Sequence, residues 1–217
     1  MKSLAWWMWL TDFPASERAL DASATPGDLA EALMGHFGRV DVLRPDAAAL
    51  ELVRNHVATE GWRPGQLETG ALSAAPWSDG TFDCVALHDT LAVSGWDAAR
   101  LLAGLERCRA LLRPGGWLAL ASPNPRLVAR LRGTASGLPP GRVRRLLRRA
   151  RFAEVRCFFI EPLIEYPTCV IPDTYAASCA FESSEAVRGA TTRARRATAR
   201  LGMRSALYPG YYMLARA

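Results

Sequence analysis

Short apolar runs alternate with stretches of helical composition along most of this 217-residue chain. The apolar runs that we interpret as strands are residues 18–22, 40–43, 82–87, 117–121, 155–160 and 211–215. Helical composition is found at residues 28–34, 45–54, 97–112 and 142–151. Strands that alternate with helices predict an α/β fold with a mostly parallel sheet covered on both faces. The wholly apolar run at 117–121 is typical of a strand buried on both faces.

The composition is that of a globular protein, with 50% hydrophobic and 22% charged residues. No apolar run approaches the ~20 residues that span a bilayer. The apolar run near the N-terminus is short and lacks a clean cleavage site, so we expect a cytoplasmic protein. Five Cys without C-x-x-C spacing and three scattered His argue against a disulfide framework and against a metal site.

We expect one domain over residues 1–217. Residues 161–207 contain three prolines and a polar stretch, so we interpret them as an insertion that covers the sheet before the last strand. Ligands of such sheets bind beyond the carboxyl ends of the strands. In this chain those ends are expected at residues 22–27, Arg44, residues 71–74 and His88–Asp89.

The order of three segments resembles class I S-adenosylmethionine (SAM) dependent methyltransferases. The segments are Leu20-Asp21 followed by Gly27, then PWSDGTFDCVALHDTL, then LLAGLERCRALLRPGGWLALASPNP. A later segment, LLRRARFAEVRCF, resembles the same family, and the likeness covers about residues 15–160 plus the last strand. The resemblance implies a doubly wound, seven-stranded Rossmann-like sheet whose last strand is antiparallel, and SAM as the cofactor.

In that family the first loop reads Asp-x-Gly-x-Gly-x-Gly, and its backbone amides approach the methionine part of the cofactor. The matching positions here are Asp21, Ser23, Thr25 and Gly27, so two of the three glycines are replaced. A β-branched Thr is poorly suited to positive φ or to a close ligand. Pro26 removes a further donor.

The family also places an acid at the end of the second strand, where it accepts the ribose hydroxyls. Arg44 has this position here, and a guanidinium has only donors. Asp46 lies two residues further on and is an alternative ligand. Ala71, followed by Leu72, stands where an Asp commonly binds the adenine amino group. These changes favour a degenerate SAM site in a non-catalytic partner subunit, or a repurposed pocket in a biosynthetic or modification pathway.

Two other functions stay open. The first is an active methyltransferase on a small molecule or peptide, with His88 and Asp89 as candidate catalytic residues, although His88 also fits a residue that only lines the pocket. Glu161, Glu165, Tyr166 and Asp173 of the insertion are candidates for substrate recognition, or simply part of a solvated cover. An oxidoreductase is disfavoured because no Gly-x-Gly-x-x-Gly loop accompanies Arg44.

Two segments suggest partners. Trp6, Trp7 and Trp9 either pack as core or mark a docking surface for another protein. The net charge of +6 is concentrated in Arg142–Arg151, which contains six arginines. This segment reads either as the solvated face of an amphipathic helix or as a site for an acidic partner. A nucleic-acid-binding module is therefore the second open function.

Overall fold

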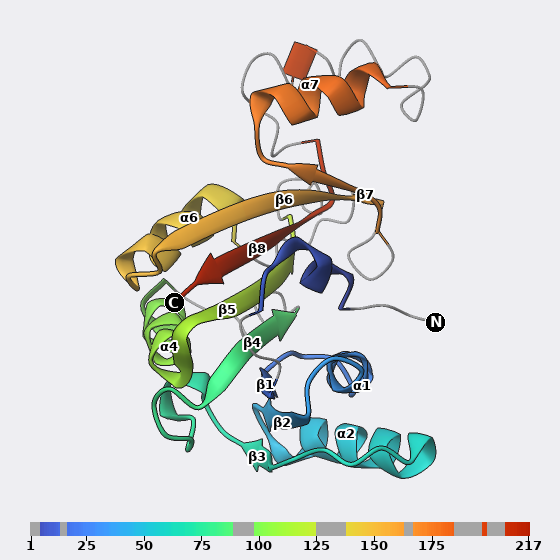
Figure 1. Cartoon of the computed structure of the whole chain (residues 1–217), viewed down its shortest axis with the longest axis vertical. Helices are drawn as coiled ribbons and strands as arrows, with labels where there is room; N and C mark the ends of the chain where they lie inside the picture. The colour runs from blue at the N-terminus through green and yellow to red at the C-terminus, as the bar shows by residue number, and fades with distance from the viewer. Residues whose placement is uncertain are drawn as a thin grey trace.

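Eight strands form one sheet in the computed structural model of the chain, in the order β3-β2-β1-β4-β5-β8-β6-β7 (Figure 1). The structure describes residues 5–13, 17–88, 98–124, 138–162, 167–184, 197–198 and 207–217. Strands β1 (Arg18–Asp21), β2 (Arg39–Arg44), β3 (Leu67–Thr69), β4 (Phe82–His88) and β5 (Leu112–Pro123) are parallel. None of the described helices is long and apolar enough to cross a membrane.

The last strand, β8 (Gly210–Arg216), runs antiparallel between β5 and β6 (Glu154–Pro162). This confirms the doubly wound, mostly parallel sheet with a reversed final strand. The expected count of seven strands is wrong by one. The additional strand is β7 (Pro167–Pro172), which pairs antiparallel with β6 at the sheet edge. It lies within the segment that we interpreted as an insertion, so part of that segment extends the sheet.

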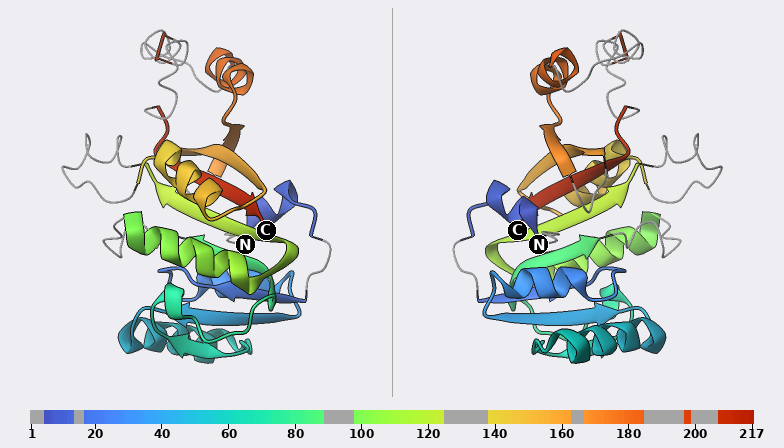
Figure 2. Two further views of the ribbon diagram at one scale, coloured as in Figure 1. Left: turned by 90° about the vertical axis from the view of Figure 1, so that its left-hand side faces the viewer. Right: turned by 90° about the vertical axis from the view of Figure 1, so that its right-hand side faces the viewer.

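Helices cover both faces of the sheet, as Figure 2 shows from two sides. On one face lie η1 (Trp6–Leu10), α1 (Asp28–Met34) and α2 (Ala47–Glu60), whose apolar side chains join one core cluster. On the other face lie η2 (Leu72–Ala74), α4 (Ala98–Leu111) and α6 (Pro140–Arg149), which build the second cluster. The alternation of strand and helix in the sequence therefore gives the layered arrangement that it predicts.

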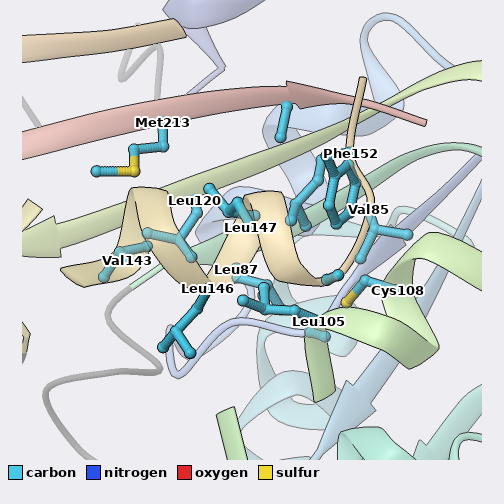
Figure 3. Packing of buried hydrophobic residues seen from close by; sticks show 14 of the residues in the cluster. Val85, Leu87, Leu105, Cys108, Leu120, Val143, Leu146, Leu147, Phe152 and Met213 are labelled. Atoms are coloured by element: carbon cyan, nitrogen blue, oxygen red, sulfur yellow. The ribbon is translucent and has the colours of Figure 1, made fainter. Parts of the chain in front are cut away.

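The core under α6 shows how an arginine-rich helix is held on the sheet. Val143, Leu146 and Leu147 share one side of α6 and are buried against β5, β8 and α4 (Figure 3). Fully burying each such side chain contributes about 1.5–3 kcal/mol before the entropy of ordering is counted. Cys108 on α4 is buried in the same cluster, as is Cys157 on β6, in line with cysteines that pack as small apolar residues.

The start of α2 differs from the expectation. We expected Pro45 inside its first turn, but Asp46 is the N-cap, and its carboxylate accepts a hydrogen bond from the amide of Ala49 at 2.8 Å. Pro45 therefore precedes the helix. This matters for the site, because Asp46 is one of the candidate ligands and its carboxylate already serves the helix.

The polar stretch after β7 begins with α7 (Tyr175–Ser183). The side chain of Thr174 caps this helix by accepting from the amide of Ala177. Asp173, just before the cap, is joined to Arg144 of α6 by an ion pair. Of the residues proposed for substrate recognition, Asp173 thus ties two elements together, Glu161 lies in β6, and Glu165 and Tyr166 lie outside the described residues.

Candidate functional site

The carboxyl ends of β1, β2 and β4 meet at one edge of the sheet, where the sequence places most of the candidate site residues. Asp21 is the last residue of β1, Arg44 of β2 and His88 of β4. Parallel pairing sets Asp21 beside Val42 of β2 and beside Ala86 of β4. The structure therefore brings Asp21, Arg44 and His88 together, as expected for a ligand site of this fold.

Asp21 and Arg44 form a buried ion pair. The Nη2 atom of Arg44 lies 2.8 Å from Oδ2 of Asp21, and the two side chains are 1% and 0% exposed. The Nη1 atom of Arg44 donates to the backbone oxygens of Asp21, at 3.1 Å, and of Leu43, at 3.0 Å. The guanidinium thus lies folded against the end of β1. Its Nε atom is buried without a hydrogen-bond partner.

The backbone amides of the loop after β1 are bonded within the protein. The amide of Ala22 donates to the oxygen of Ala86 at 2.9 Å, and that of Ala24 to the oxygen of His88 at 3.0 Å. The amide of Ser23 donates to Oδ1 of Asp21 at 2.9 Å. The amide of Thr25 faces Oγ of Ser23 at 3.4 Å, and the two hydroxyl oxygens of Ser23 and Thr25 are 2.8 Å apart. Four consecutive amides therefore have acceptors in the chain itself.

Helix packing explains why the loop retains a glycine at Gly27. It is the N-cap of α1 with φ of +137°, a region that side chains rarely adopt. A β-carbon at this position would stand 3.0 Å from the imidazole ring of His56 on α2. The Nε2 atom of His56 lies 2.9 Å from a carboxylate oxygen of Glu31 on α1, which fixes the ring over the glycine. Close contact between α1 and α2 thus explains Gly27 without a ligand.

The remaining candidate ligands lie at the end of β3 and the start of α2. Gly70 follows β3 and donates its amide to the backbone oxygen of Arg44 at 2.9 Å. Ala71 is exposed, whereas Leu72 is 6% exposed and belongs to the core. Asp46 is exposed and caps α2. Ala71 therefore offers only its backbone to a ligand, and Leu72 stabilises the core.

His88 is buried at the end of β4, and it contacts aromatic residues from two other segments. The hydroxyl of Tyr212 on β8 lies 2.6 Å from its Nε2 atom. The ring of Trp7 lies 6.4 Å away, measured between centroids. Burial lowers the pKa of His88 from 6.5 to about 4, and the nearby negative charge of Asp21 opposes this only in part. The lowered pKa makes the ring a weak base at pH 7, which favours the interpretation of His88 as a lining residue.

Tyr212 is the residue of this site that the sequence did not single out. It is fully buried, and the register places it beside Ala121, which in turn pairs with His88. A Tyr inside an apolar final strand is a weak signal for a buried hydroxyl that needs a partner. Asp89, the second catalytic candidate, lies outside the described residues.

The three N-terminal tryptophans separate into different environments. Trp7 is fully buried, and Trp6 is half-buried with its ring edge-on to Tyr212 at 4.9 Å between centroids. Both therefore pack against the sheet. Trp9 is 85% exposed. Of the two interpretations of this segment, packing describes Trp7 and Trp6, and an exposed aromatic side chain is left at Trp9 alone.

Comparison with known proteins agrees with this architecture. Residues 19–116 match the sequence model of a family described as a methyltransferase domain. No curated protein matches the chain significantly. Many solved structures match it.

One similar structure is a proposed sarcosine dimethylglycine methyltransferase from Galdieria sulphuraria, with a TM-score of 0.65 and 18% identity over 98% of this chain and 83% of that one. A SAM-dependent methyltransferase from Archaeoglobus fulgidus has a TM-score of 0.63 and 16% identity over 99% and 92% of the two chains. Phosphoethanolamine N-methyltransferase 2 from Haemonchus contortus, in complex with SAM, has a TM-score of 0.64 and 12% identity. The match covers 99% of this chain and 51% of that one. The chain therefore has the fold of SAM-dependent methyltransferases, and its residues 19–116 match the sequence model of a methyltransferase domain.

Proposed function

We propose that this chain has the methyltransferase fold but no longer uses SAM in the manner of its family. It would act as a non-catalytic partner subunit, or with a repurposed pocket, in a biosynthetic or modification pathway. The observation that carries this proposal is the loop after β1, in which the amides of residues 22–25 all have internal acceptors. An amide that donates within the protein cannot also hold the methionine part of a cofactor without giving up that bond.

The ribose end of the site supports the same proposal. Arg44 can only donate, so it cannot accept from ribose hydroxyls. Asp21 accepts from Ser23 through one carboxylate oxygen and from Arg44 through the other. Breaking a buried ion pair costs about 3–5 kcal/mol, which corresponds to about two to three and a half orders of magnitude in a dissociation constant. A ligand that recruited Asp21 for its ribose would bind weaker by that factor.

Calorimetric titration with SAM and with S-adenosylhomocysteine tests the proposal. We expect no binding heat at ligand concentrations up to about 1 mM. The same preparation must unfold cooperatively on heating, which shows that the absence of binding heat is not due to unfolded protein. SAM at that concentration should also leave the melting temperature unchanged, because a ligand that binds the folded state raises it. A dissociation constant in the micromolar range would refute the proposal.

An active methyltransferase is the second candidate. The shared fold favours it, since a neighbour that matches 99% of this chain is in complex with SAM. Micromolar binding followed by transfer of the SAM methyl group to a small molecule or peptide would establish this function. Methyl transfer depends mainly on the alignment of the nucleophile with the methyl carbon and the leaving sulfur, so a neutral His88 does not argue against it.

A further inference from the structure

Helix α6 has two opposite sides of different chemistry. Its apolar side is packed into the core through Val143, Leu146 and Leu147 (Figure 3). Its other side is exposed and consists of guanidinium groups, and a further arginine follows the helix: Arg142, Arg145, Arg148, Arg149 and Arg151. We call these five residues the α6 arginine face. The distance along the helix axis from Arg142 to Arg149 is about 10 Å.

The charge of the α6 arginine face is not compensated by described residues. Arg144, which is not part of the face, forms an ion pair with Asp173. Within the described ranges, none of the five arginines of the face forms an ion pair. Exposed arginines elsewhere do form pairs, as Arg54 does with Glu51 and Arg156 with Glu154. The face therefore concentrates the positive charge of a chain whose net charge is +6 and whose pI is about 9.4.

The chemistry of the face distinguishes between classes of partner. Protein interfaces have apolar or aromatic centres, but the exposed large apolar residues of the described chain lie on η1, α2 and α7: Trp9, Leu52 and Tyr175. A membrane-binding helix needs a free apolar side, and that side of α6 is packed. Single-stranded nucleic acid is held by stacking on aromatic rings, and α6 has none. Interfaces with duplex nucleic acid are polar and strongly positive.

We propose that the α6 arginine face binds the phosphate backbone of double-stranded nucleic acid without sequence preference. Guanidinium groups suit this ligand, because their planar donors bind phosphate oxygens in pairs and stay charged. Helix α4 lies beside α6 on the same side of the sheet, so the face stands on a two-helix layer (Figure 2). The inference is independent of whether SAM binds, since the face lies on α6 and just after it, whereas the candidate site lies at the ends of β1, β2 and β4.

Fluorescence anisotropy with labelled duplexes of about 20 base pairs tests the proposal, using DNA and RNA of one mixed sequence. The Arg145→Gln/Arg149→Gln variant removes two charges from the face. Each lost phosphate contact lowers the slope of log affinity against log salt by about 0.9, so we expect a slope smaller by about 1.8. Between about 50 and 200 mM salt, wild-type affinity should then fall about twelve-fold more than that of the variant. Whichever duplex binds more tightly identifies the source of the phosphates.

The matched control is Arg54→Gln/Arg63→Gln, which removes the same charge at exposed positions on α2 and near β3. It should retain nearly all of the wild-type slope. All the changed arginines are on the surface, so circular dichroism should show folded proteins throughout. An equal decrease of the salt-dependence slope in both double variants would overturn the proposal. Absence of binding to either duplex at about 50 mM salt would also overturn it, as would tighter binding to polyglutamate, which would point to an acidic protein.

Discussion

The buried imidazole of His88 predicts a loss of stability in mild acid that a single substitution should remove. The folded protein holds His88 with a pKa of about 4, whereas the value in an unfolded chain is near 6.5. Between these values the unfolded state binds a proton that the folded state does not. The contribution of His88 to stability is therefore fully present above about pH 6.5 and is lost as the pH falls toward 4.

The size of the effect follows from the two pKa values. One pH unit corresponds to 1.36 kcal/mol, so the contribution of His88 to the unfolding free energy should fall by about 2 kcal/mol between pH 7.5 and pH 5. Below pH 4 the loss should level off at about 3 kcal/mol. A change of about 2 kcal/mol is a large part of the stability of a typical domain.

Urea unfolding at a series of pH values measures this contribution. In His88→Gln the side chain does not titrate and still presents an amide to the hydroxyl of Tyr212. Carboxylates titrate in both proteins, so the difference between wild type and variant isolates His88. The control variant is His36→Gln, which removes an exposed imidazole instead of the buried one. Its stability should follow the wild-type curve. If wild type and His88→Gln lost stability in parallel between pH 7.5 and pH 5, burial of a neutral imidazole would be refuted.

Three further results are expected in denaturant unfolding. Arg44→Met should lower stability by about 3–5 kcal/mol, because it leaves the carboxylate of Asp21 buried without its partner. The double variant Arg44→Met/Asp21→Asn should lose less stability than the two single variants together, because it leaves no unpaired buried charge. Gly27→Ala should cost about 1 kcal/mol or more, since φ is +137° and a β-carbon would press on a neighbouring ring. Trp7→Ala should cost about 3–5 kcal/mol, whereas the exposed Trp9 should tolerate the same change within about 0.5 kcal/mol.

The layered fold could be predicted because its signals are local. Helix α1 spans the residues expected for it, and the wholly apolar run at 117–121 lies inside β5, buried on both sides. Strand β7 was missed because it is short and begins and ends with proline, which argues against a strand in the sequence pattern. At the edge of a sheet, however, these prolines are tolerated, since one row of amides has no partner strand.

The positions of the candidate site residues could be predicted from the sequence, but the contacts between their side chains could not. Parallel topology alone brings the ends of β1, β2 and β4 together, so Asp21, Arg44 and His88 were grouped correctly. That Arg44 turns back onto Asp21 depends on side-chain conformation, which no pattern reveals. The sequence predicted Arg44 as a residue that fails to bind ribose, and the structure adds that it also occupies the carboxylate of Asp21.

The loop after β1 separates two physical explanations for weak SAM binding. If the side chains of Ser23 and Thr25 only block the ligand, Ser23→Gly/Thr25→Gly should restore micromolar binding. If the amides are already engaged, the same variant frees only the amide of residue 25. Ala22 and Ala24 still donate to strand oxygens, and the amide of residue 23 still donates to Asp21. One freed bond is worth about 0.5–1.5 kcal/mol, or about a two- to twelve-fold gain. Because the wild type is expected to show no binding heat up to about 1 mM, the dissociation constant of the variant should stay near or above about 0.1 mM in calorimetry. Recovery of micromolar affinity would show that the hindrance is steric.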